Sequence, residues 1–211
     1  MALANSARAR ILERIRRAPQ LAGDAGSVSL EEIYGAIHDP MQRFLDECAA
    51  NLTEVKRTRD ASASVCALQE LLHALPPGMI YVEDAPKLRS FSEAIEGREV
   101  LYSSTSRAPE NSQATLTLCD GLVAQTGSIV TSSRHGGRCG SIVAPVHMVY
   151  ATTDQLVPDI STALRNAMSA GLTHASYFGL ISGSSRTADI EKILVHGAHG
   201  PRKVLLILED R

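Results

Sequence analysis

The residue types best suited to binding a small ligand lie in a glycine- and serine-rich segment, residues 182–191. The flanking patterns predict a strand over 176–181 and a helix over 187–194. A glycine here would let a ligand approach the backbone closely, and free N–H groups at the start of the helix would attract a carboxylate or phosphate. The alternative interpretation is an ordinary helix N-cap with an acidic residue in the first turn. The candidate binding residues are Ser182, Gly183, Ser185, Thr187, Asp189 and Glu191.

A second candidate segment, residues 196–202, places two histidines, two glycines and an arginine before a predicted strand. His199 could transfer a proton near neutral pH, with Asp189 and Glu191 orienting it. Arg202 could make a bidentate contact to an anion. Gly200 lies between His199 and Arg202 in the sequence. The histidines have no third ligand nearby in sequence, so no metal site is expected. The alternative is a loop histidine held by ordinary hydrogen bonds.

A third segment consists of Gln125, Thr126 and Gly127, which we expect on a strand that enters a hairpin. A glycine inside a strand marks a bulge or a close approach of the backbone, or simply an irregularity of the sheet. Because all three segments lie at strand ends or strand glycines, we expect them to form one pocket. The α-carbons of Thr126, Gly183 and His199 should then lie within about 15 Å of one another.

The elements that must position these residues alternate between strands and helices. Asp39 and Pro40 predict a helix start with an N-cap and a proline at the first helical position, and Asp60 predicts a second N-cap. This alternation predicts an α/β fold with a mainly parallel sheet. Helices are expected over 4–17, 40–51, 60–75, 85–96 and 154–170, and strands over 53–58, 79–82, 99–102 and 203–208.

The middle of the chain predicts a β-hairpin. Residues 123–131 alternate and are β-rich, residues 142–151 are strongly apolar, and a glycine-rich segment at 135–137 separates them. We therefore expect 123–131 to pair with 142–151 across a tip at 135–137.

Composition restricts the class of protein. The 211 residues carry 21 Lys+Arg against 23 Asp+Glu, a formal net charge of -2, with three phenylalanines and no tryptophan. The near-neutral charge argues against the basic stripe of nucleic-acid proteins, and the few aromatic residues argue against a platform that stacks bases. No apolar run reaches the ~18 residues of a membrane span. We expect a cytoplasmic protein with a helical arm and linker over 1–30 and one α/β domain over 31–211.

The four cysteines predict free thiols and no cofactor. Cys48, Cys66, Cys119 and Cys139 are widely spaced and form no CxxC pair, so neither a zinc nor an iron–sulfur site is indicated. No dinucleotide-binding fingerprint is present. Cys139 lies in a basic segment that could lower the pKa of its thiol, although a buried or inert thiol is the more common outcome.

Taken in order, these segments resemble the LUD-domain family, and in particular its lactate-utilization members, over residues 40–210. The similar motifs stand here as Gln125-Thr126-Gly127-Ser128, Pro145-Val146-His147-Met148-Val149, Ser182 to Glu191 and Gly197 to Pro201. The resemblance implies a three-layer core like that of the NagB/RpiA/CoA-transferase folds, with a mainly parallel sheet and an inserted β-hairpin. Gln125 stands where that family usually has glutamate, and a carboxamide neither titrates nor attacks well.

The resemblance implies an accessory role in L-lactate utilization. The redox centres would belong to iron–sulfur partner proteins that oxidise L-lactate to pyruvate, and this chain would bind a small anion or a partner. One alternative is an enzyme of CoA-transferase or 5-formyltetrahydrofolate cyclo-ligase type, for which Arg134, Arg138 and the turn at Gly183 would have to supply the phosphate site. Another is a regulatory or structural module without catalysis. Fold similarity alone does not choose among them.

Overall fold

The computed structural model describes residues 7–18, 36–105, 109–134, 138–188, 194–196 and 200–211. The chain divides into one unit over 1–36 and another over 37–211. The first unit contains α1 (Ala7–Arg17). The predicted division at residue 30 remains a prediction. Within the described residues, no helix is long and apolar enough to cross a membrane.

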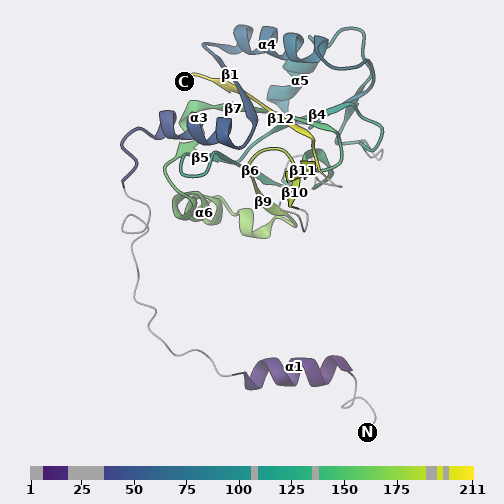
Figure 1. The fold of residues 1–211 in the computed structure, drawn as a ribbon. Helices are drawn as coiled ribbons and strands as arrows, with labels where there is room; N and C mark the ends of the chain where they lie inside the picture. Colours follow the sequence, from purple (N-terminus) through teal and green to yellow (C-terminus); the bar gives the residue numbers. More distant parts are fainter. Residues whose placement is uncertain (1–6, 19–35, 106–108, 135–137, 189–193, 197–199) are drawn as a thin grey trace. The chain divides into compact units, whose positions relative to one another are not determined.

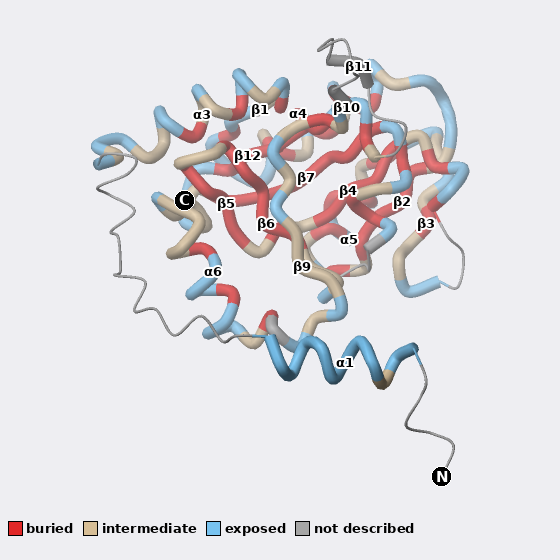
Figure 2. Tube along the Cα trace, turned by 60° about the horizontal axis from the view of Figure 1, so that its bottom comes forward, coloured by how far each residue is buried: buried red, intermediate tan, exposed pale blue. Residues whose placement is uncertain are grey.

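A six-stranded sheet forms the centre of the second unit, and all its neighbouring strands run parallel. Strand β7 is buried at all seven positions, as expected of a central parallel strand covered on both faces. Figure 2 shows these strands among the most buried parts of the molecule. In spatial order the strands are β1 (Thr53–Thr58), β12 (Lys203–Glu209), β7 (Val146–Thr152), β4 (Ala114–Leu118), β2 (Ile80–Val82) and β3 (Val100–Tyr102).

Two helices cover one face of this sheet, α4 (Ala61–His73) and α5 (Pro86–Ser92) (Figure 1). The Asp60 side chain accepts a hydrogen bond from the Ala63 N–H, so the predicted N-cap is confirmed. Their apolar side chains form the first core with the facing side of the sheet.

The other face packs against α3 (Pro40–Ala50) and a second, four-stranded sheet. The Asp39 carboxylate caps α3 by accepting from the Gln42 N–H at 3.0 Å, as its position before a proline predicts. The second sheet has the order β8-β5-β6-β9, formed by β8 (Leu156–Val157), β5 (Gly121–Val123), β6 (Ser128–Ser132) and β9 (Phe178–Ile181). Helix α6 (Ile160–Ser169) packs on its far side. The predicted α/β class with a mainly parallel sheet is confirmed.

The predicted pairing of the hairpin is wrong. Residues 123–131 do not pair with 142–151, because β7 lies in the parallel sheet between β12 and β4. The antiparallel hairpin is instead formed by β5 and β6, and β6 also pairs with β9. The continuous apolar run of 142–151 is the pattern of a strand buried on both faces, whereas a hairpin arm with one exposed face would alternate.

The predicted helix over 187–194 is also wrong, because the residues at both ends of this range lie in strands. Arg186–Ala188 (β10) and Leu194–His196 (β11) form an antiparallel pair in which Thr187 lies opposite Val195. Both residues are β-branched and favour extended backbone when a partner strand is available. No helix therefore begins at Ser185, and the predicted anion site at a helix N-terminus is withdrawn.

The predicted helix over 154–170 is shorter than expected. A 3-10 turn (Thr153–Gln155) and β8 precede it, and α6 begins only after Pro158 and its N-cap, Asp159. Proline disfavours helical backbone at the residue before it, which explains the late start. Two further 3-10 turns occupy Arg138–Ser141 and Leu172–His174.

Candidate functional site

The turn over 124–127, between β5 and β6, contains the first predicted group of site residues. Gln125, Thr126 and Gly127 therefore lie in a tight turn and not on a strand, which corrects the expectation. Gly127 has a φ of +61°, a value that side-chain-bearing residues rarely adopt. The Gln125 N–H donates to the Pro158 carbonyl at 2.9 Å, which anchors this turn to the start of α6.

The C-terminal end of α3 holds this turn in place. The Asn51 side-chain amide donates to the Thr126 carbonyl at 3.0 Å. A Cβ at Gly127 would lie 2.7 Å from the backbone nitrogen of Cys48, so only glycine allows this close approach. Gly127 thus allows two backbone segments to pack closely.

The turn after β9 packs against the same end of α3. Gly183 follows the end of β9, as predicted, with a φ of +90°. A Cβ at this position would overlap the carbonyl oxygen of Asn51. Arg186 extends the contact, because its guanidinium donates to the same carbonyl at 3.4 Å.

A chain of three hydroxyl groups joins the two turns. Ser128 lies 2.6 Å from Thr126 and 2.6 Å from Ser182, measured between side-chain oxygens. Ser128 is buried and Ser182 is exposed. Three hydroxyls have three protons and these two hydrogen bonds use two, so one of the three hydroxyls keeps a donor for another group.

The described part of the second predicted segment joins this group. The Ser185 N–H donates to the Pro201 carbonyl at 2.8 Å, and Gly200, with a φ of +94°, packs against the Ser185 side chain. The Arg202 N–H donates to the Pro145 carbonyl at 2.8 Å, and the Arg202 side chain is exposed. Asp189, Glu191 and His199 lie outside the described residues, as does the side chain of Thr187.

These turns meet at the amino-terminal edge of the parallel sheet. Asn51 precedes β1, Pro145 precedes β7 and Arg202 precedes β12. In α/β folds, ligands usually bind at the carboxyl ends of the parallel strands. These segments lie elsewhere, because β9 belongs to the second sheet and Arg202 precedes β12.

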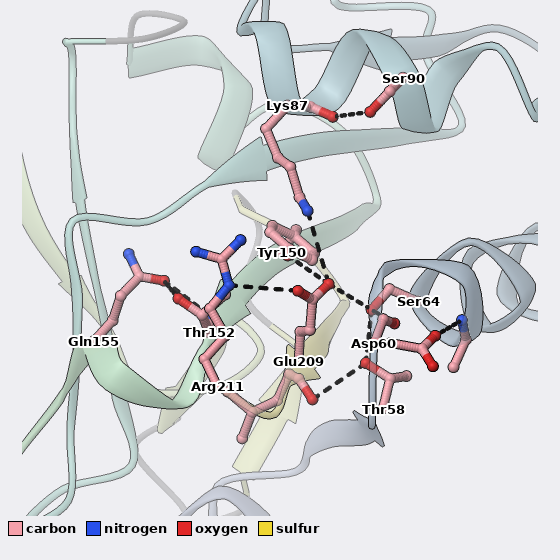
Figure 3. Close-up of polar contacts among 12 residues, drawn as sticks. Thr58, Asp60, Ser64, Lys87, Ser90, Tyr150, Thr152, Gln155, Glu209 and Arg211 are labelled. Atoms are coloured by element: carbon pink, nitrogen blue, oxygen red, sulfur yellow. Dashed lines mark hydrogen bonds and ion pairs between the residues drawn. The ribbon is translucent and has the colours of Figure 1, made fainter.

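The opposite, carboxyl edge carries a dense polar network at the ends of β12 and β7 (Figure 3). The buried Glu209 carboxylate accepts from the Tyr150 hydroxyl at 2.7 Å and from Ser64 at 3.3 Å. Lys87 and Arg211 lie 3.8 and 3.5 Å from its oxygens. These groups satisfy one another and tie α4 and α5 to the sheet.

His147 lies near the amino-terminal edge and was not among the predicted site residues, although its motif was noticed in the sequence. Its side chain is fully buried, and its Nε2 lies 2.9 Å from the Thr117 hydroxyl. Burial lowers the pKa of His147 to about 4, so the imidazole is neutral at pH 7. Ser128 and Arg186 stand in the quoted motifs but were likewise not predicted as site residues. Asn51 was missed entirely, since nothing local in the sequence predicts its contacts.

Burial of His147 makes stability depend on pH. Because its pKa is lower in the folded than in the unfolded chain, protonation favours unfolding as the pH falls from about 6.5 to about 4. We expect this group to remove up to about 3 kcal/mol of unfolding free energy over that range. Urea denaturation of the wild-type chain and of His147→Asn at several pH values should show a shallower pH dependence in the variant. Equal slopes would contradict the assignment.

The cysteines separate into two classes. Burial raises the pKa of Cys48 to about 12, with Glu47 adding to the effect, and burial raises the pKa of Cys119 to about 12. Neither thiol can act as a thiolate nucleophile near neutral pH. Cys66 and Cys139 are exposed free thiols.

Native protein should therefore expose two reactive thiols to Ellman's reagent and denatured protein four. Mass spectrometry after brief alkylation should locate the label on Cys66 and Cys139. Rapid labelling of Cys48 or Cys119 in the folded chain would contradict the burial described above.

Among the described residues, no group of three or more His, Cys, Asp or Glu side chains could hold a metal ion. The expectation that the chain binds no cofactor of its own remains a prediction. Elemental analysis and a visible absorption spectrum of the purified protein are its direct checks.

Comparison with known proteins identifies similar chains. The LUD domain model matches residues 4–208. Lactate utilization protein C from Deinococcus radiodurans is 31% identical over 101 residues, 47% of each chain. Lactate utilization protein C from Bacillus subtilis is 26% identical over 181 residues, 77% of this chain and 75% of that protein. The match thus spans about half the length of the first relative.

A solved structure shares the fold. The crystal structure of a DUF162 family protein from Deinococcus radiodurans superimposes with a TM-score of 0.63 at 18% identity, covering 80% of this chain and 95% of that one. At this identity the likeness concerns the fold alone.

Proposed function

The chain belongs to the LUD domain family, and from this membership we propose that it is an accessory component of lactate utilization. The observation that carries the proposal is the family match over residues 4–208, together with curated relatives named Lactate utilization protein C. In this role the chain acts in the cytoplasm with iron–sulfur proteins that oxidise L-lactate to pyruvate. Those partners carry the electrons, and this chain contributes a binding site.

The proposed binding site is the group of turns at the amino-terminal edge of the parallel sheet. Its ligand is a small anion. Arg186 and Arg202 supply positive charge, and guanidinium groups bind carboxylates in bidentate geometry. The hydroxyl chain from Thr126 through Ser128 to Ser182 supplies a further donor. Backbone N–H groups of a helix, which the sequence suggested for this purpose, play no part.

Deleting the gene tests the proposed function. We expect the deletion strain to lose growth on L-lactate as sole carbon source and to grow normally on pyruvate, because only the oxidation step is missing. Expression of the wild-type chain from a plasmid should restore growth. Normal growth of the deletion strain on L-lactate, in a strain without a second copy, would contradict the proposal.

A further inference from the structure

Directly below the amino-terminal edge, one register row of the parallel sheet carries buried polar side chains. Val204 of β12 pairs with Thr53 on one side and His147 on the other, and His147 pairs in turn with Thr115 of β4. Register neighbours in a parallel sheet point to the same face and lie about 5 Å apart. Val204 belongs to the core shared with α3 and the second sheet, so the whole row faces that side.

Three polar atoms of this row have no hydrogen-bond partner within the part of the chain that the structure describes. One is the hydroxyl oxygen of Thr53, on the far side of Val204. The other two lie on adjacent strands and are Nδ1 of His147 and the hydroxyl oxygen of Thr115, whose side chains are both 0% exposed. The Thr117 hydroxyl holds the other ring nitrogen of His147 and so fixes the imidazole plane. Buried polar groups are almost always hydrogen-bonded, so two such atoms on adjacent strands point to a further group that they bind.

The amino-terminal edge of the sheet, next to this row, carries positive charge. Arg202 precedes Val204 by two residues, and residues two apart on a strand share a face. Its neighbour Lys203 pairs with Glu54 at 2.8 Å on the other face, which agrees with this alternation. Two residues of strand span about 7 Å, within reach of an arginine side chain. The exposed Arg202 side chain is therefore long enough to reach the edge of this uncharged polar row.

We propose that His147 Nδ1 and the Thr115 hydroxyl bind the 2-oxygen of a small 2-hydroxy or 2-oxo carboxylate, whose carboxylate pairs with Arg202. The inference rests on the proposed function and specifies the ligand of its site. A neutral imidazole nitrogen suits an uncharged oxygen, and the low pKa of His147 keeps it neutral. A hydroxyl both donates and accepts, so it matches either imidazole tautomer.

The test measures binding of L-lactate, pyruvate and propionate by isothermal titration calorimetry to the full-length chain. Propionate has the same carboxylate but lacks the 2-oxygen, so it would leave the buried atoms unpaired. We expect L-lactate or pyruvate to bind at least about tenfold more tightly than propionate.

Matched variants assign the contact to individual atoms. His147→Gln keeps a polar group near Nε2 for Thr117 and removes the one at Nδ1, and Thr115→Val removes the hydroxyl while keeping the shape. Each should weaken binding of the favoured acid at least about tenfold and leave propionate unchanged. Thr53→Val is the control, because its buried hydroxyl is separated from His147 by Val204, and it should bind as the wild type does.

Two results would overturn the inference. One is wild-type protein that binds neither acid, or binds both no better than propionate. The other is unchanged binding of the favoured acid by folded Thr115→Val, which would mean that these buried atoms bind only water. Thr115→Val alone decides the outcome if His147→Gln does not fold. Neither result changes the outcome expected in the growth test. If the chain is needed for growth on L-lactate but gives either of these binding results, only the inference about the ligand is disproved, and the proposed function stands.

Discussion

Gly183→Ala should lower the free energy of unfolding by about 3 kcal/mol or more. A left-handed backbone costs a residue with a side chain about 1–2 kcal/mol, and overpacking against a fixed neighbour adds about 1–3 kcal/mol. The neighbour here is the backbone carbonyl of Asn51, which cannot move without disturbing the end of α3. Displacing the turn should also separate Ser182 from Ser128. Urea denaturation at pH 7 measures the loss.

Gly97→Ala is the matched control. Gly97 also has a positive φ, +69°, but no heavy atom lies within 4 Å of a Cβ placed there. We expect it to lose only the backbone contribution, about 1 kcal/mol. Equal losses at the two glycines would show that contact with Asn51 does not determine the packing of this turn.

Glu209→Gln should be the second large effect, with a loss of about 2–3 kcal/mol of unfolding free energy at pH 7. The carboxylate is 5% exposed and accepts hydrogen bonds from Tyr150 and Ser64, beside two cations (Figure 3). Lys87 and Arg211 are partly exposed and regain water when the charge is removed, which keeps the loss below that of a fully buried ion pair. Thermal and urea denaturation measure it.

The pH dependence of this variant follows from the same contacts. Burial by itself would raise the pKa of Glu209, but the Tyr150 hydroxyl and the Lys87 ammonium outweigh it and lower the pKa overall. A lowered pKa means that the ionised group stabilises the fold above about pH 4.5 and that this contribution is lost as the pH falls further. The difference between wild type and Glu209→Gln should therefore shrink toward pH 3.

Asp210→Asn provides the comparison for the carboxyl edge. Asp210 pairs with Arg57 at 2.7 Å, but both side chains are nearly half exposed. Exposed pairs contribute about 0–1 kcal/mol, so this neighbouring substitution should have a small effect. A loss as large as that of Glu209→Gln would show that burial is not what distinguishes the two carboxylates.

Helix starts were the most predictable part of the fold, because their signals are local. Asp39 and Asp60 each accept from a backbone N–H three residues later, as their positions predict. The strand at 187 was not predictable in this way. Its partner, β11, begins six residues after β10 ends, and the residues between them, three charged and two apolar, are equally compatible with a helix.

That the candidate segments lie together was predictable from the sequence, but their position in the fold was not. Described residues of all three predicted segments meet, through contacts such as Ser128 to Ser182 and Ser185 to Pro201. Their meeting depends on Asn51, whose role comes from tertiary packing that no short motif reports. At Gly127 and Gly183 another backbone segment does approach closely, and that segment is the end of α3.

The most direct test of the account is to complement the deletion strain with an Arg186→Gln/Arg202→Gln double variant on L-lactate. Both side chains are exposed, so the double variant should fold and accumulate like the wild type while failing to restore growth. Arg59→Gln/Arg165→Gln removes two exposed arginines away from these turns and should restore growth fully. If the Arg186/Arg202 variant supported growth on L-lactate at the wild-type rate, the amino-terminal edge of the sheet would not be the site through which this chain acts.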